Sequence, residues 1–196
     1  MEKIRLHDKE FTIFLSPAEI QDAVSDMAAK INNDLVGKYP LFLGILNGSF
    51  MFTADLLKKI NIDCSVSFIK LASYRGARTT GTVKELIGLD EDLGGRTVVI
   101  LEDIVDTGTT LQSLVSRLRE LNPLEVRIAT LLLKPGAFSG GIHLDYVGME
   151  IPNDFIVGYG LDYDQLGRNF EGIYKIAAGG VTEPDPAAQA GSNEKQ

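Results

Sequence analysis

The chain has 196 residues, of which 44% are hydrophobic and 23% are charged, the composition of one ordinary globular domain. The formal net charge of −8 argues against nonspecific binding to nucleic acid, so we expect no nucleic-acid partner. No apolar run approaches membrane-spanning length and the first residues lack the apolar stretch of a signal peptide, so we expect no membrane contact and a cytoplasmic location. The single cysteine, Cys64, cannot form an internal disulfide, and a strand predicted beside it indicates a buried, unreactive thiol.

The first predicted elements are a helix, a strand and a second helix. Residues 16–19 read Ser-Pro-Ala-Glu, a capping box that begins a helix with its apolar residues on one face. Residues 41–46 form an apolar strand that runs into Asn47, Gly48 and Ser49, and residues 50–60 follow as a helix. A junction of small residues before a helix can bind an anion, although on its own a plain tight turn is the default interpretation.

A strand over residues 65–71 leads into a segment rich in Gly, Ser and Thr, residues 73–82. This segment begins with Ser73 and Tyr74 and carries two arginines, and by itself it is typical of a surface connection. We expect a returning strand over residues 84–89 and an acidic turn over residues 90–95.

The most informative stretch is residues 98–110. Four apolar residues predict a buried strand, and Glu102 and Asp103 follow, then two more apolar residues. The loop that comes next comprises Asp106, Thr107, Gly108, Thr109 and Thr110. From Leu111 the apolar spacing becomes helical. In an open α/β sheet, ligands bind where the carboxyl ends of strands meet helix N-termini, so this loop is a candidate binding site.

The loop has the chemistry of a phosphate site with acids beside it. Gly108 permits close backbone approach, and threonine hydroxyls lie next to the free amides of a helix start. Glu102, Asp103 and Asp106 would then hold hydroxyls, bind a hard cation such as Mg²⁺, or accept a proton. A sugar phosphate would need acids in all three of these roles. The plain alternative is that the segment is only a buried strand ending in a capped helix, with its acids solvated.

Two later segments have both plain and functional interpretations. A strand over residues 125–133 ends at Lys134; a lysine there is usually solvated, but this strand follows the helix after residue 110, which favours a place near the same cleft. Phe155, within residues 151–163, would ordinarily be a core aromatic. Residues 179–196 are rich in Gly, Ala, Pro and polar residues, and we expect a disordered tail.

Residues 98–110 resemble the phosphoribosyl-pyrophosphate motif of type I phosphoribosyltransferases, with Glu-Asp, two apolar residues and Asp-Thr-Gly-Thr-Thr. The run Val-Gly-Tyr-Gly-Leu-Asp-Tyr at residues 157–163, followed by Arg168, is close to the hypoxanthine-guanine members. The resemblance extends from about residue 10 to residue 176. It implies an α/β fold with a central, mostly parallel sheet flanked by helices, in a single domain over residues 1–178. A small hood subdomain would come from the N-terminus and residues 150–176.

The resemblance also implies an activity. The enzyme would transfer the 5-phosphoribosyl group from phosphoribosyl pyrophosphate to N9 of a 6-oxopurine, hypoxanthine and also guanine, releasing pyrophosphate. Such enzymes act in purine salvage, use Mg²⁺, have only small-molecule substrates, and are commonly homodimers or homotetramers.

For the sugar phosphate, the resemblance implies that Asp106, Thr107, Gly108, Thr109 and Thr110 hold the 5′-phosphate. Glu102 and Asp103 would hold the ribose hydroxyls and the metal, and Ser73 and Tyr74 would belong to a catalytic lid. Asn47 and Gly48 would bind pyrophosphate together with Arg168, which would also be a catalytic residue.

For the purine, the resemblance implies that Lys134 donates to the exocyclic oxygen and Phe155 stacks on the ring. Ile156 would contact the base edge through its backbone, and Asp162, beside the base, would be a second metal ligand. Asp106 would be the general base, or hydrogen-bond partner, at N7.

One residue departs from the family pattern, because Asn47 stands where a lysine is expected. The family often has a non-proline cis peptide before the glycine, which gives the hypothesis of a cis Asn47–Gly48 bond. Two alternatives stay open: a sibling enzyme that prefers xanthine, and a noncatalytic regulator that senses the sugar phosphate. The intact Asp106, Lys134 and Phe155 argue against the regulator.

Overall fold

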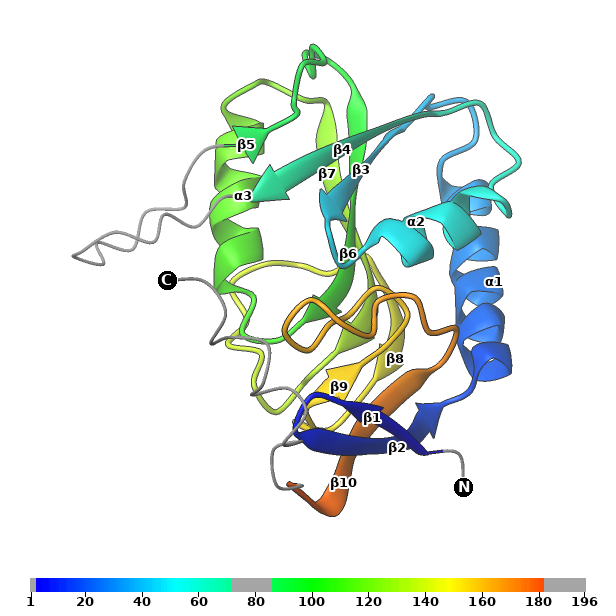
Figure 1. The fold of residues 1–196 in the computed structure, drawn as a ribbon. Coiled ribbons are helices and arrows are strands. Elements are labelled where there is room, and N and C mark those ends of the chain that lie inside the picture. Colours follow the sequence, from blue (N-terminus) through cyan, green and yellow to red (C-terminus); the bar gives the residue numbers. More distant parts are fainter. Residues whose placement is uncertain (1–2, 72–85, 182–196) are drawn as a thin grey trace, which may run out of the picture. The chain divides into compact units, whose positions relative to one another are not determined.

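The computed structural model describes residues 3–71 and 86–181. The chain divides into two units, each of which has its own sheet. Unit 1 is Met1–Pro17 with Asp154–Gln196, and unit 2 is Ala18–Asn153. Figure 1 shows the elements of both units along the chain.

Unit 2 contains a six-stranded sheet in the order β5-β4-β3-β6-β7-β8. In chain order its strands are β3 (Leu41–Leu46), β4 (Ser65–Leu71), β5 (Leu86–Ile87), β6 (Thr97–Val105), β7 (Glu125–Leu133) and β8 (Tyr146–Glu150). Every neighbouring pair from β4 to β8 is parallel, and only β5 pairs antiparallel, with β4. This confirms the predicted α/β class with a central, mostly parallel sheet.

Helices cover both faces of this sheet, with α3 (Thr109–Arg119) on one face and α1 (Pro17–Asp34) and α2 (Phe50–Leu57) on the other (Figure 1). Because side chains alternate between the faces of a strand, a central strand is mostly apolar on both faces where helices cover it. Residues 97–101 of β6 are accordingly all buried. The parallel strands β3 and β6 end at the same edge of the sheet, so the loops that follow them lie at that edge.

Unit 1 is a four-stranded antiparallel sheet in the order β1-β2-β10-β9. Its strands are β1 (Lys3–Leu6), β2 (Lys9–Leu15), β9 (Ile156–Val157) and β10 (Ile173–Val181). A separate hydrophobic cluster of Leu6, Phe11, Val157 and Tyr174 forms its core. The first strands of the chain are therefore packed with the last strand.

Several predicted element bounds need correction. Helix α2 ends at Leu57 rather than at residue 60, because the N–H groups of Lys59 and Ile60 donate to carbonyls only three residues back, at 2.9 and 3.2 Å. Of the strand expected over residues 84–89, β5 covers two residues, while residues 84 and 85 lie outside the described part. Strand β10 continues to Val181, past the expected start of the tail at residue 179, and residues 182–196 lie outside the described part.

The prediction of a buried Cys64 is wrong, because this cysteine is exposed. It directly precedes β4, which lies next to the short edge strand β5 and keeps most of its own residues exposed. Partial burial and the neighbouring Asp63 carboxylate nevertheless raise the pKa of the thiol, so it stays protonated at neutral pH.

Across the two described ranges, none of the helices combines the length and the apolar character needed to cross a membrane.

Candidate active site

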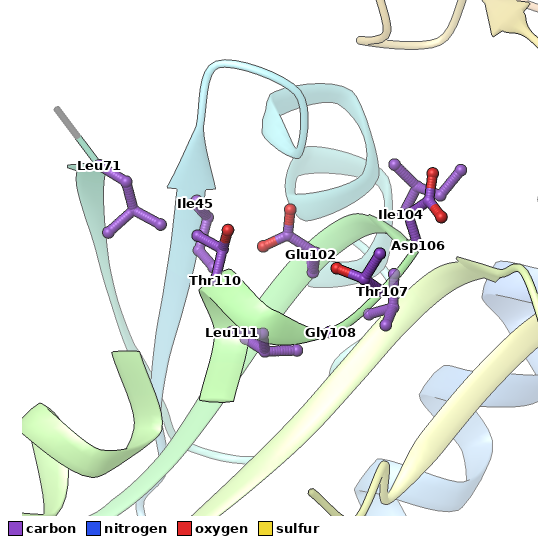
Figure 2. Close-up of a pocket in the computed structure, with 10 residues that line it drawn as sticks. Ile45, Leu71, Glu102, Ile104, Asp106, Thr107, Gly108, Thr110 and Leu111 are labelled. Atoms are coloured by element: carbon purple, nitrogen blue, oxygen red, sulfur yellow. The ribbon is translucent and has the colours of Figure 1, made fainter. Parts of the chain in front are cut away.

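A pocket opens at the carboxyl end of β6, where the strand passes into α3. Figure 2 shows that its lining comes from the end of β6, the start of α3 and the neighbouring strands β3 and β4. The lining residues are Ile45, Leu71, Glu102, Ile104, Val105, Asp106, Thr107, Gly108, Thr110 and Leu111. The predicted phosphate loop and one predicted acid therefore share one cavity.

The loop over residues 106–110, the phosphate loop, ends in a helix N-terminus. Gly108 is the N-cap of α3 with φ of 81°, a left-handed conformation that side chains with a Cβ rarely adopt. Its carbonyl accepts the N–H of Gln112 at 2.9 Å, which closes the first turn. The amides of a first turn have no partner within the helix and carry the positive end of its dipole, so they suit a phosphate group.

The two acids of β6 have different surroundings. Glu102 is partly buried and lines the pocket, whereas Asp103 is 8% exposed and is not among the lining residues. Asp103 Oδ1 accepts the N–H of Ile104 at 3.0 Å. Burial, the neighbouring Asp103 charge and a hydrogen bond with Asp103 raise the pKa of Glu102 well above its usual range.

Asp103 also packs against the loop that follows β3. A Cβ placed on Gly48 would lie 1.7 Å from Asp103 Oδ2, so only a glycine fits beside this carboxylate. The Ser49 hydroxyl donates to Ile45 O at 2.7 Å and fixes the turn before α2. The hypothesis of a cis Asn47–Gly48 bond is wrong: the one cis bond among the described residues is Leu46–Asn47, a single bond earlier.

Lys134 lies beside Asp106. Strand β7 ends at Leu133, and because β6 and β7 are parallel, the residue after β7 lies next to the end of β6. Lys134 Nζ donates to Asp106 Oδ2 at 3.4 Å, with the lysine side chain 13% exposed and the aspartate side chain 54% exposed. The expected place of Lys134 near the cleft is therefore the observed one, with the ammonium next to a pocket-lining carboxylate.

In unit 1, Phe155 presents an aromatic face that other rings support. It is 47% exposed, makes a T-shaped contact with Tyr163 at 5.7 Å between centroids, and is tilted against Phe11 at 6.3 Å. The carbonyl of Phe155 accepts the N–H of Ile176 at 3.2 Å, while Ile156 is buried in β9. An exposed ring held edge-on by its neighbours can stack on a flat ligand.

Asp162 and Arg168 form an ion pair within unit 1. Arg168 Nη2 lies 2.5 Å from Asp162 Oδ1, and Arg168 Nη1 donates to Gly160 O at 2.6 Å. Asp162 Oδ2 also accepts the N–H of Gln165 at 2.8 Å. Both side chains are thus engaged with each other and with a turn, and any role toward a ligand stays a prediction.

The carboxylates fit a magnesium ion that takes few protein ligands. Within residues 3–71 and 86–181, no three His, Cys, Asp or Glu side chains gather to hold a metal ion. Mg²⁺ typically keeps waters and substrate oxygens beside one or two carboxylates. Glu102 fits that demand, because a cation would offset the unfavourable pairing of its charge with Asp103. Ser73 and Tyr74 lie outside the described residues.

A sequence profile of the phosphoribosyl transferase domain family matches residues 15–164. The chain belongs to this family. The match contains both loops at the edge of the parallel sheet, together with Lys134, Phe155 and Asp162.

Similar proteins within this family are named for purine bases. The hypoxanthine-guanine phosphoribosyltransferase of Staphylococcus epidermidis is 42% identical over 176 residues, which cover 88% of this chain and 97% of the relative. The protein of the same name from Staphylococcus aureus is 40% identical, over 84% of this chain and 92% of the relative. A crystal structure of a hypoxanthine phosphoribosyltransferase from S. aureus matches with a TM-score of 0.77 at 38% identity, covering 85% of this chain and 91% of that one.

A hypoxanthine phosphoribosyltransferase structure from Trypanosoma cruzi matches with a TM-score of 0.79 at 32% identity, over 89% of this chain and 95% of that one. The fold and the phosphoribosyltransferase resemblance inferred from the sequence are therefore confirmed.

Two residues that contact the phosphate loop were not predicted. The Phe138 ring packs against Gly108, and Ser139 donates to Thr107 O at 2.9 Å. Both stand in a glycine-rich segment that follows Lys134 by several residues, and nothing in their spacing signals such a contact. The different placement of Glu102 and Asp103 had a signal, since neighbouring residues of a strand alternate in burial.

Proposed function

We propose that this protein transfers the 5-phosphoribosyl group of phosphoribosyl pyrophosphate to N9 of hypoxanthine and of guanine, in purine salvage. The observation that carries the proposal is the pocket in which the phosphate loop at the start of α3 lies beside Glu102 and next to the Asp106–Lys134 pair. The relatives named for hypoxanthine and guanine, at 40–42% identity, support the same reaction.

The phosphate loop binds the 5′-phosphate through its amides and threonine hydroxyls. Glu102 and Asp103 hold the ribose hydroxyls. Glu102, Asp103 and Asp162 are proposed to hold magnesium directly or through bound water, since no three of the described acidic side chains gather around one point. When bound, Mg²⁺ neutralises the pyrophosphate leaving group. Asn47 and Gly48 contact the pyrophosphate through their backbone, and Arg168 adds a positive charge. Ser73 and Tyr74, which lie outside the described residues, are proposed to help exclude water, which would otherwise trap the electrophilic ribose.

The purine lies with Lys134 toward its 6-oxygen and Asp106 toward N7. This donor and this acceptor, 3.4 Å apart in the structure, complement the adjacent O6 acceptor and N7–H donor of a 6-oxopurine. Adenine carries an amino group at position 6, so two donors would face each other and one would lose its partner. Phe155 stacks on the ring, Ile156 offers backbone groups to the base edge, and Asp162 lies beside the base.

Two further proposals concern the whole protein. It assembles as a homodimer or homotetramer. Light scattering after size exclusion tests this, with an expected mass of two or four times 21.3 kDa. It acts in the cytoplasm on small-molecule substrates, without a nucleic-acid or membrane partner.

A steady-state assay tests the reaction, with phosphoribosyl pyrophosphate, Mg²⁺ and one of four bases in each sample. Turnover of hypoxanthine and guanine without turnover of adenine is the expected result. Turnover of xanthine alone would replace the proposed substrate by that of a sibling enzyme. No turnover with any base, in protein that still binds the sugar phosphate, would favour a noncatalytic regulator. Asn47 would then be the first residue to replace with lysine.

A further inference from the structure

The segment after β7 folds back against the phosphate loop. The N–H of Lys134 donates to Val105 O at 2.9 Å, which extends the pairing of β6 and β7 by one residue. The N–H groups of Ala137 and Phe138 both donate to Lys134 O at 3.0 Å, which closes a turn. This turn, residues 134–139, brings Phe138 and Ser139 onto the phosphate loop.

Ser139 fixes one peptide group of that loop. Its N–H and its hydroxyl both donate to Thr107 O, at 3.3 and 2.9 Å. The Thr107–Gly108 peptide is trans and planar, so its carbonyl and its N–H point in opposite directions. With the carbonyl held by Ser139, the N–H of Gly108 points away from Ser139. Thr107 and Gly108 both line the pocket, which makes this amide a candidate donor for an anion there.

Phe138 restrains the next residue from a second direction. A Cβ on Gly108 would lie 2.7 Å from Phe138 Cε2, so the ring fills the space that a side chain would need. Phe138 is partly buried and packs against the hydrophobic cluster under α3, which restricts the movement of its ring. A side chain at position 108 is therefore excluded twice, by the left-handed backbone conformation and by the Phe138 ring.

We propose that Phe138 and Ser139 are positioning residues that orient the Thr107–Gly108 peptide for binding of the 5′-phosphate. Neither contacts the substrate, and both act through the phosphate loop. The inference rests on the proposed function only in the identity of the ligand, a ribose phosphate. Because the same turn begins at Lys134, it ties the phosphate loop to the residue proposed to contact the base.

The first test replaces Ser139 with alanine, which removes the hydroxyl donor and keeps the N–H donor. We expect the Kd of ribose 5-phosphate and the KM of phosphoribosyl pyrophosphate to rise about threefold, the effect of one exposed hydrogen bond. The KM of hypoxanthine and kcat stay unchanged, because the interaction is lost equally in the bound and transition states. Ser139→Thr keeps the hydroxyl and restores both constants.

Ser116→Ala is the matched control, because this exposed serine donates to Gln112 O at 3.0 Å on the surface of α3, about two helical turns beyond Gly108. Phe138→Ala is the second variant, with an expected rise of about tenfold in both constants and in the same direction. Unchanged constants in Ser139→Ala and Phe138→Ala, or equal losses for hypoxanthine and for ribose 5-phosphate, would overturn the inference. If no base is turned over but Ser139→Ala still weakens ribose 5-phosphate, the inference stands and the proposed function fails.

Discussion

At position 106 a half-exposed carboxylate lines the pocket and lies 3.4 Å from Lys134 Nζ. A carboxylate in this position can take a proton from a bound base, whereas an amide cannot. We expect Asp106→Asn to lower kcat by roughly 10²-fold or more, the usual contribution of a general base. Stopped assays with hypoxanthine measure this loss.

The matched control for this variant is Asp26→Asn, which makes the same change on the exposed surface of α1. The control is expected to keep full activity. An Asp106→Asn enzyme with near-normal kcat would show that the assignment of the base is wrong.

Gly48 is a second residue whose role depends on a single neighbour. Because Asp103 Oδ2 occupies the space of a Cβ, we expect Gly48→Ala to displace either the carboxylate or the loop after β3. Overpacking of this kind costs about 1–3 kcal/mol, which lowers the melting temperature by roughly 2–12 °C in a chain of this size. Thermal unfolding by circular dichroism measures the shift.

Gly136→Ala is the comparison for thermal stability, since the nearest atom to its Cβ would be Asn153 Nδ2 at 3.5 Å, an ordinary contact. Equal melting temperatures for the two variants would contradict tight packing of Gly48 against Asp103.

At the scale of elements, a polar network joins the starts of β6 and β7. Thr97 Oγ1 and Lys38 Nζ each donate to Glu125 Oε1 at 3.0 Å, and Arg127 Nε donates to Glu125 Oε2 at 2.9 Å. Thr97 and Glu125 are also register partners of the two strands. Burial raises the pKa of Glu125, but the hydrogen bonds from Lys38, Arg127 and Thr97 outweigh it and lower the pKa below the usual value.

A depressed carboxyl pKa has a definite sign in the dependence of stability on pH. The folded protein binds the proton of Glu125 less readily than the unfolded chain, so the contribution is full above the unfolded pKa of about 4.5 and is lost as the pH falls through the folded value. We expect Glu125→Gln to lower the melting temperature at pH 7 by roughly 2–4 °C, the equivalent of about 1 kcal/mol.

The difference from wild type should shrink as the pH falls from 4.5 through the lower folded pKa of Glu125, below which both chains lack this charge. Melting curves between pH 3 and 7 measure it, with Glu150→Gln at the exposed end of β8 as the control. A difference that stays constant over this range would exclude Glu125 as its source.

How much of the fold and of the candidate site the sequence could predict depends on how far apart in the chain the contacting residues lie. The phosphate loop was predictable because strand, loop and helix are contiguous, and the apolar spacing changes at Leu111. The contact of Lys134 with Asp106 spans 28 residues and requires the parallel pairing of β6 and β7, so the sequence could place Lys134 near the cleft but not beside a particular side chain. Cys64 was mispredicted because the sequence does not reveal that β4 lies next to a two-residue edge strand.

At the scale of the whole molecule, the residues proposed to bind ligand divide between the two units. The phosphate loop, the acids of β6 and Lys134 belong to unit 2, whereas Phe155, Ile156, Asp162 and Arg168 belong to unit 1. Each unit has its own hydrophobic cluster. A core substitution in unit 1 should therefore disturb the packing of Phe155 and its aromatic neighbours and leave the phosphate loop unchanged.

Phe11→Ala tests this division. Phe11 is fully buried, packs in the unit 1 core and contacts the rings of Phe155 and Tyr163. The loss of a buried phenylalanine costs about 3–5 kcal/mol, so we expect the melting temperature to fall by roughly 6–20 °C. Below the transition, binding of hypoxanthine should weaken while the Kd of ribose 5-phosphate stays near the wild-type value.

Phe14→Ala makes the same change at a partly buried position of the same strand, β2, and should cost far less. If Phe11→Ala weakened ribose 5-phosphate as much as hypoxanthine, the two units would not respond separately.

The pairing of β2 with β10 has a consequence for synthesis on the ribosome. The antiparallel sheet of unit 1 takes β1 and β2 from the beginning of the chain and β10 from near its end, with Lys9 opposite Val181. Unit 2 is continuous in sequence, so it can fold while translation is still in progress. The first hairpin, in contrast, has to wait until its partner strand, Ile173–Val181, has been made. A chain that is released from the ribosome but lacks residues 173–181 would therefore combine a parallel sheet with an uncovered β2.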